Sequence, residues 1–297
     1  MTHLRAFVRL SRPLFLYGGF AGVALGAAVA HRSGHRLNLE TYLWVQALVT
    51  SFHLMVHYAN DYFDHRGDAG ARRTLWSGGS GVLDGGALPA RVALIAALVC
   101  AALGFIASAH FALAGNANVA WTGVAIFVFA WCYSAPPIRF AARGLGELDA
   151  ALVVAVLVPC AGFAAFAGRL DGTMLAAVEP TAFAMLAMML CVELPDAGED
   201  ALCGKRNLAV RFGPARTWQA IRLLAFLAVL SAVVTASRTD AGPPLLALAP
   251  AAIAAAALLW VVQRDPRPAS IAFGGVALYA ATVTGLAVFY ASLAPRL

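Results

Sequence analysis

The chain has 297 residues, of which 61% are hydrophobic and only 12% are charged. Soluble domains typically carry about 25% charged residues, so this composition excludes a disordered protein and argues against a water-soluble enzyme. The formal net charge is +6, from 21 lysine and arginine residues against 15 acidic residues.

Long apolar segments predict helices that cross a lipid bilayer, because about 20 mostly apolar residues span its hydrocarbon core. The segments lack the alternation of membrane β-strands, and their many alanine and glycine residues suit close helix packing in lipid. We therefore expect an all-α polytopic membrane protein, a single domain over residues 1–297 with nine transmembrane helices around a central cavity. In chain order, the predicted segments are Leu14–Ala30, Tyr42–Tyr62, Val92–Leu113, Val119–Ser134, Leu148–Gly168, Met174–Leu194, Thr217–Ala236, Leu245–Gln263 and Ile271–Leu293.

Basic residues are distributed unequally between the two sides of the predicted bundle. With the N-terminus inside, fifteen lysine and arginine residues lie in cytoplasmic segments and five lie on the opposite side. This bias follows the positive-inside rule, so the basic charge indicates orientation and no nucleic-acid partner. We predict a bacterial-type inner-membrane protein whose active site faces the cytoplasm.

Acidic residues are concentrated in two short windows, 61–68 and 193–200, which hold seven of the fifteen acidic side chains. In each window three acids recur at positions i, i+3 and i+7, which share one face of a helix. Each acid of the second set follows its counterpart by 132 residues, which suggests a diverged internal duplication. The first set is Asp61, Asp64 and Asp68, and the second is Glu193, Asp196 and Asp200.

Each acidic set ends a predicted helix on the cytoplasmic side, where the helix terminus already carries partial negative charge. Three stacked carboxylates repel one another, so some would take up protons unless cations intervene. Magnesium suits such a site, because it takes one or two carboxylates together with waters and substrate phosphate oxygens. Two sets facing each other across a cavity would hold a diphosphate between metal ions. Solvated polar loops are the alternative, which the repeated spacing disfavours, and Glu199 is expected to point off the shared face.

Other segments carry residues suited to binding charge. Lys205 is the only lysine of the chain, and a compact ammonium group suits diphosphate binding. Tyr133 could turn an aromatic face toward a cation or belong to the interfacial aromatic belt. Arg139 could bind an anionic acceptor group or follow the positive-inside bias. The glycine- and serine-rich residues 77–82 could present backbone N–H groups to phosphate or form a linker.

Together these motifs resemble the UbiA superfamily of intramembrane prenyltransferases. The resemblance covers nearly the whole chain, with N-D-x-x-D from Asn60, Y-S-A-P-P from Tyr133, and D-x-x-x-D from Asp196 followed by G-K-R. Residues 77–82 and Gly144-Leu145-Gly146-Glu147 look most like the menaquinone branch, which prenylates 1,4-dihydroxy-2-naphthoate. In that branch the second motif usually begins with asparagine, where this chain has Glu193.

The resemblance implies Mg²⁺ as cofactor, a polyprenyl diphosphate and an aromatic acceptor as substrates, and a reaction inside the lipid bilayer. It implies catalytic roles for Asp61, Asp64, Asp196, Asp200, Lys205 and Tyr133, and binding of the magnesium diphosphate or acceptor by Asn60, Asp68, Arg73 and Arg139. The implied metal ligands are Asp61, Asp64, Asp68, Glu193, Asp196 and Asp200.

The expected function is Mg²⁺-dependent transfer of a polyprenyl group to 1,4-dihydroxy-2-naphthoate in menaquinone biosynthesis, with 4-hydroxybenzoate and homogentisate as alternative acceptors. A polytopic cation transporter is the alternative of another class. Transporters place such acids near the membrane midplane on broken helices, whereas these acids lie at helix ends on one side. A CDP-alcohol phosphotransferase is also disfavoured, because its pattern needs glycine where this chain has His65.

Overall fold

The structure is a computed structural model that describes residues 2–65, 76, 79–239, 248–264, 267–293 and 295. In these residues the secondary structure is entirely helical, which confirms the predicted all-α class. The helices that form the bundle are α2 (Leu16–Arg32), α3 (Leu39–Asp64), α4 (Ala90–Leu113), α5 (Ala117–Ser134), α6 (Gly146–Leu152), α7 (Val158–Ala167), α8 (Gly172–Glu193), α10 (Leu208–Ser237), α11 (Ala249–Arg264) and α12 (Pro268–Ser292). The remaining elements are α1 (His3–Leu10), α9 (Ala197–Leu202), the 3-10 turns η1 (Pro13–Phe15), η2 (Phe140–Arg143) and η4 (Leu194–Asp196), and the π-helical turn η3 (Val153–Leu157).

Side-chain caps explain where several helices begin. Asn38, Asn116, Asp171 and Asn207 precede α3, α5, α8 and α10, and each accepts a hydrogen bond from a backbone N–H in the first helical turn. Such caps satisfy donors that a helix leaves unpaired, and each stabilises its helix by about 1 kcal/mol.

Seven helical stretches in the described ranges are long and apolar enough to cross a membrane. The predicted segments lie on helices wherever the structure describes them, but a count of nine crossings is not confirmed. The two segments outside the seven are those on α3 and α11. Helix α3 carries polar residues such as Gln46, His57 and Asp61, and α11 extends over 16 residues.

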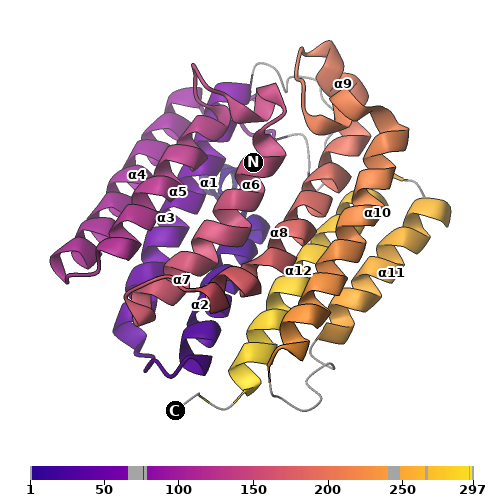
Figure 1. The fold of residues 1–297 in the computed structure, drawn as a ribbon. Helices are drawn as coiled ribbons and strands as arrows, with labels where there is room; N and C mark the ends of the chain where they lie inside the picture. The colour runs from indigo at the N-terminus through magenta and orange to yellow at the C-terminus, as the bar shows by residue number, and fades with distance from the viewer. Residues whose placement is uncertain are drawn as a thin grey trace.

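The helices form two groups with a boundary between them (Figure 1). Helices α3, α4 and α5 pack together on one side, and α8, α10, α11 and α12 pack together on the other. Helices α2, α6 and α7 lie between these groups, where α2 contacts both α7 and α12. The arrangement leaves the ends of α3, α5 and α8 around one end of the bundle.

Glycine allows a close contact between the backbones of α2 and α7. A Cβ atom added at Gly26 would lie 2.1 Å from the Pro159 carbonyl oxygen, and one added at Gly162 would lie 2.7 Å from the Val23 carbonyl oxygen. Only glycine permits this backbone approach, which is the small-residue packing expected where lipid replaces water around helices.

Helices α6 and α7 are joined by the π-helical turn η3, whose wider winding alters the usual backbone hydrogen bonds. The hydroxyl of the buried Thr181 on α8 donates a 2.8 Å hydrogen bond to the Ala155 carbonyl within this turn. This contact satisfies a carbonyl that would otherwise be costly to bury in an apolar setting.

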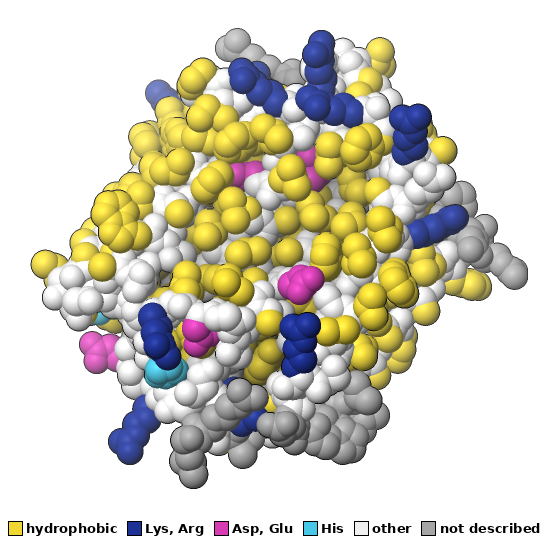
Figure 2. All heavy atoms as spheres, viewed as in Figure 1, with side chains coloured by type: hydrophobic (Ala, Val, Ile, Leu, Met, Phe, Trp, Pro, Cys, Tyr) yellow, Lys and Arg dark blue, Asp and Glu magenta, His cyan; other side chains and the backbone are white. Residues whose placement is uncertain are grey.

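The outer surface agrees with a membrane location. Figure 2 shows apolar side chains across the middle of one face, with lysine and arginine gathered toward its upper and lower margins. Large side chains such as Ile106, Leu223 and Phe273 are each more than half exposed. Exposed apolar surface of this extent is unfavourable in water and is expected in contact with lipid chains.

Candidate active site

A cavity of about 330 Å³ lies between the two helix groups. Apolar side chains that include Phe52, Val153 and Met185 form part of its wall. The charged residues that line it come mainly from helix ends and the loops beside them. This combination of an apolar wall and a few convergent polar groups is typical of ligand-binding sites.

Asp64 ends α3 and connects the first acidic motif to the Y-S-A-P-P segment. The Asn60 amide donates to Asp64 Oδ2 at 2.7 Å and to Ser134 Oγ at 2.8 Å. The Ser134 hydroxyl also donates to Asp64 Oδ2, at 3.3 Å, and the Arg139 guanidinium lies 3.4 Å from Asp64 Oδ1. The structure therefore brings together three of the predicted site residues, Asn60, Asp64 and Arg139, and adds Ser134.

Asp61 has a different environment, although it lies only three positions before Asp64. Its carboxylate is 5% exposed and forms an ion pair with Arg12. It also accepts hydrogen bonds from the hydroxyl and the backbone N–H of Ser80. Asp64 lines the cavity, whereas Asp61 is bound behind it by Arg12 and Ser80.

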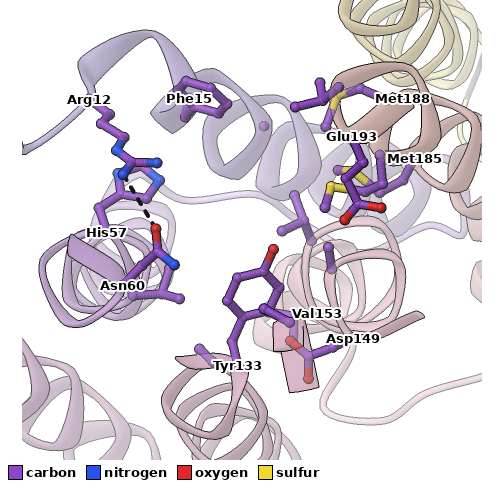
Figure 3. A pocket seen from close by; sticks show the side chains of 18 of the residues that line it. Arg12, Phe15, His57, Asn60, Tyr133, Asp149, Val153, Met185, Met188 and Glu193 are labelled. Atoms are coloured by element: carbon purple, nitrogen blue, oxygen red, sulfur yellow. Dashed lines mark hydrogen bonds between the residues drawn. The ribbon is translucent and has the colours of Figure 1, made fainter. Parts of the chain in front are cut away.

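Arg12 is a site residue that sequence reasoning treated only as evidence of orientation. It joins α1 to η1 with a left-handed backbone conformation, at a φ of 46°. Its guanidinium lines the cavity beside His57 and donates to Asn60 Oδ1 at 3.3 Å (Figure 3). Arg12 and Asn60 are 48 positions apart, so no local sequence pattern could indicate their contact. Pro13, which follows Arg12, indicates only that the chain turns there.

The second acidic motif does not continue on a single helix face. Helix α8 ends at Glu193, and the 3-10 turn η4 and helix α9 follow. Pro195 explains the break, because proline lacks a backbone donor and its ring clashes with the preceding turn. The expected i, i+3, i+7 face therefore does not form here.

The acids of this second motif nevertheless lie at the same cavity. Glu193, Asp196 and Asp200 all line it, and so does Glu199. Glu199 is expected to point off the face that the other three acids share, but that face does not form, and all four acids line the cavity. Lys205 lies 3.1 Å from Asp200 Oδ1 and also lines the cavity.

Asn207 fixes the other oxygen of Asp200. Its side-chain amide donates to Asp200 Oδ2 at 2.7 Å while its own oxygen caps α10. Sequence reasoning missed Asn207, although its position before an apolar helix is a recognisable cap signal.

Tyr133 lies on the cavity wall and not in an outward-facing aromatic belt. Its hydroxyl points into the cavity, with the carboxylate of Glu193 across from it and Asp149 near its base (Figure 3). The position fits a group that faces a developing positive charge, and that role stays a prediction.

The loops that carry Arg139 and Lys205 are tied to each other. The Arg206 N–H donates to the Ala142 carbonyl at 3.0 Å, and the Arg211 guanidinium donates to the Arg143 carbonyl at 2.6 Å. Gly144 allows this contact, because its φ is 73° and an added Cβ would lie 2.4 Å from the Arg206 carbonyl oxygen. These contacts hold the loops that carry Arg139 and Lys205 next to each other at the edge of the cavity.

Two predicted site residues, Asp68 and Arg73, lie outside the described residues, as do Ser77 and Gly78 of the glycine-rich segment. The described part of that segment contributes Ser80, which binds Asp61 through both its hydroxyl and its backbone N–H. A phosphate contact from this segment stays a prediction.

The donor atoms around the cavity fit magnesium. Asp64, Asp196 and Asp200 present hard carboxylate oxygens, which Mg²⁺ prefers. Across the described ranges, no three or more histidine, cysteine or acidic side chains gather closely enough to hold a metal by themselves. Mg²⁺ needs only one or two carboxylates from a protein when water and a bound phosphate supply its other ligands.

Comparison with known proteins identifies the family. The UbiA prenyltransferase family matches residues 20–283 of the chain. No curated protein sequence matches this chain. The fold is similar to that of a digeranylgeranylglyceryl phosphate synthase, with a TM-score of 0.69, 16% identity, and coverage of 99% of this chain and 100% of that one.

Two archaeal structures are similarly close in fold. A UbiA homolog from Archaeoglobus fulgidus bound to GPP and Mg²⁺ gives a TM-score of 0.70 at 18% identity, covering 97% of this chain and 100% of that one. The apo form of a UbiA homolog from Aeropyrum pernix K1 gives 0.72 at 15% identity, covering 93% and 98%. These identities support the fold alone, whereas the family match covers most of the sequence. The chain therefore belongs to the UbiA prenyltransferase family and is a membrane prenyltransferase.

Proposed function

We propose that this enzyme transfers a polyprenyl group from a prenyl diphosphate to an aromatic acceptor, and that the acceptor is 1,4-dihydroxy-2-naphthoate. The observation that carries the proposal is that residues of both acidic motifs, Asn60 and Asp64 from the first and Glu193, Asp196 and Asp200 from the second, line one cavity that also has an apolar wall. The UbiA homolog from Archaeoglobus fulgidus binds GPP or DMAPP together with Mg²⁺, which supports the donor class. The choice of acceptor is supported by the sequence resemblance of residues 77–82 and 144–147 to the menaquinone branch.

The diphosphate would bind where the two acidic motifs approach the cavity. Asp64 on one side and Asp196 and Asp200 on the other would hold Mg²⁺, with Asp61, Asp68 and Glu193 as the remaining predicted ligands. Bound magnesium would supply Lewis acidity that neutralises the leaving diphosphate.

Cations of the chain would share the task of holding the phosphates. Arg12, Arg139 and Lys205 line the same cavity, and each is held close to an aspartate of one of the motifs. When the diphosphate binds, a small movement of each side chain would exchange its ion pair with a carboxylate for one with a phosphate oxygen. Asn60 orients Asp64, and Arg73 is a predicted further contact.

The prenyl tail needs an apolar route toward lipid. The central cavity shares Tyr17 and Ala280 with a second cavity of about 380 Å³ between α2 and α12, whose lining includes Val288. The Tyr17 and Thr284 hydroxyls form a hydrogen bond at this junction. We propose that the tail passes from the central cavity along this route.

Prenyl transfer breaks the allylic C–O bond and releases diphosphate, while a ring carbon of the acceptor forms a new C–C bond with the allylic carbon. The ring then loses its proton to the diphosphate or to a nearby carboxylate. Tyr133 would face the allylic carbon, where its aromatic ring can stabilise developing positive charge. The surrounding helices would exclude water that could otherwise capture the prenyl group.

An acceptor panel tests the proposal. Purified enzyme is incubated with Mg²⁺, labelled geranyl diphosphate and one of 1,4-dihydroxy-2-naphthoate, 4-hydroxybenzoate or homogentisate, and products are identified by mass spectrometry. We expect a prenylated naphthoate and much less product from the other two acceptors. Preferred prenylation of a different acceptor would overturn the naphthoate assignment. If none of the three acceptors gave a labelled product, the aromatic class of acceptor would be overturned.

A further inference from the structure

Asp149 is a buried carboxyl group that belongs to neither acidic motif. It lies in the first turn of α6, lines the central cavity and is only 7% exposed. Its Oδ1 atom is fully buried and has no hydrogen-bond partner in the part of the chain that the structure describes. Burial of a polar atom without a partner costs about 1–3 kcal/mol, so such a group calls for a specific explanation.

The neighbouring acid Glu147 shows what a structural role looks like in the same turn. Glu147 is fully buried, and its Oε1 accepts a hydrogen bond from the Leu208 backbone N–H at the start of α10, although its Oε2, like Asp149 Oδ1, has no hydrogen-bond partner among the described residues. It therefore helps to attach α6 to α10, and it does not line the cavity. Asp149 makes no comparable side-chain contact among the described residues, and it faces the space where substrate would bind.

The surroundings of Asp149 suit a flat aromatic ring. Figure 3 shows its carboxylate beside the Tyr133 ring and Val153, with Met185 and Met188 on another wall of the same pocket. Methionine side chains adapt to irregular shapes and make favourable contacts with aromatic rings. Because the protein itself encloses Oδ1, the other carboxylate oxygen is the one through which Asp149 can accept a hydrogen bond within this mostly apolar part of the cavity.

We propose that Asp149 accepts a hydrogen bond from a hydroxyl group of the aromatic acceptor and so selects and orients that ring. The inference rests on the proposed function, because it names how the same cavity recognises the acceptor. A carboxyl group can accept such a bond whether or not it is ionised. A buried group that needs a hydroxyl partner discriminates strongly against an analogue that lacks one.

The test compares acceptors that differ in one hydroxyl group. The substrates are 1,4-dihydroxy-2-naphthoate and its 1-methyl and 4-methyl ethers, each with geranyl diphosphate and Mg²⁺. We expect wild-type enzyme to prefer the diol over at least one ether by about tenfold or more in kcat/KM. In Asp149→Leu and Asp149→Ala that preference should fall to within about threefold, mainly through a higher KM for the diol.

Two controls separate this role from a general loss of structure. Glu147→Gln removes the other carboxylate of the same turn and should keep the wild-type ratio between diol and ether. Mg²⁺-dependent binding of geranyl diphosphate should persist in both Asp149 variants, and the alanine variant decides the result if the leucine variant does not fold. An undiminished preference in the Asp149 variants, or no preference in wild type, would overturn the assignment. Failure of wild-type enzyme to prenylate any of the three compounds would instead overturn the proposed naphthoate acceptor, and this inference with it.

Discussion

Asp61 and Asp64 have the same residue type and lie one helical turn apart, yet their surroundings differ. Asp64 faces the cavity with Asn60, Ser134 and Arg139 around it. Asp61 is buried against Arg12 and the Ser80 backbone and hydroxyl. Asp64 therefore suits direct contact with a magnesium diphosphate, whereas Asp61 also holds the N-terminal segment and the loop before α4 in place.

Substitution of Asp61 should consequently affect both stability and activity. In Asp61→Asn the partly buried Arg12 loses its carboxylate partner, so we expect the free energy of unfolding to fall by about 1–3 kcal/mol. We expect this variant to lose prenyl transfer as well. Asp196→Asn should also lose prenyl transfer. Thermal unfolding in detergent, measured beside activity, compares them; equal melting temperatures for Asp61→Asn and wild type would contradict the anchoring role.

Residue spacing predicted part of this site. Asp64, Tyr133, Glu193, Asp196, Asp200 and Lys205 all line the cavity, because each lies at or just after a helix end that the apolar pattern locates. Arg12 and Asp149 could not be identified in the same way, since their positions depend on how α1 and α6 pack against α3 and α8. In the sequence, Arg12 is explained equally well by the positive-inside rule, and Asp149 by the preference for acidic residues in the first turn of a helix.

At the scale of elements, the apolar segments predicted the helices well but not their interruptions. Helix α8 stops at Glu193, and Pro195 then redirects the chain through η4 into α9. Periodicity continued across this point in the sequence, so it predicted one helix face where the structure has two helices. The turn η3 was also not predictable, because its π-helical winding is supported by a tertiary contact from Thr181.

Contact between α2 and α7 depends on Gly26. In Gly26→Ala the new Cβ would meet the Pro159 carbonyl oxygen and the Phe163 nitrogen, so the helices must separate. We expect a loss of about 1–3 kcal/mol, seen as a lower melting temperature in detergent. Gly172→Ala, where the described neighbours leave open space, is the matched control and should leave the melting temperature unchanged. A Gly26→Ala protein as stable as this control would contradict the packing.

At the scale of the whole molecule, the acidic residues that line the cavity and the cations beside them are gathered at one end of the bundle. Three aspartates there are each matched by a basic residue, in the pairs Arg12–Asp61, Arg139–Asp64 and Lys205–Asp200. Such pairing limits the cost of bringing many acids together without substrate. It also places cations beside the carboxylates, ready for an anionic ligand.

Orientation can be tested through Cys203, which is exposed and lines the same cavity. In a variant that keeps Cys203 as its single cysteine, a membrane-impermeant maleimide should label inverted inner-membrane vesicles but not intact spheroplasts. Added geranyl diphosphate with Mg²⁺ should slow the labelling. Labelling only from the outside would contradict the cytoplasmic orientation that the positive-inside bias predicts.

The most direct test of the account is Mg²⁺-dependent prenyl transfer by wild-type enzyme and by Asp64→Asn and Asp196→Asn, one variant from each acidic motif. Rates are measured with labelled geranyl diphosphate and 1,4-dihydroxy-2-naphthoate over a magnesium titration, on protein of matched thermal stability. We predict that wild-type activity requires Mg²⁺ and that each substitution lowers it by about 100-fold or more. Near wild-type turnover in either variant at saturating Mg²⁺ would contradict the central claim that both motifs act together on one diphosphate.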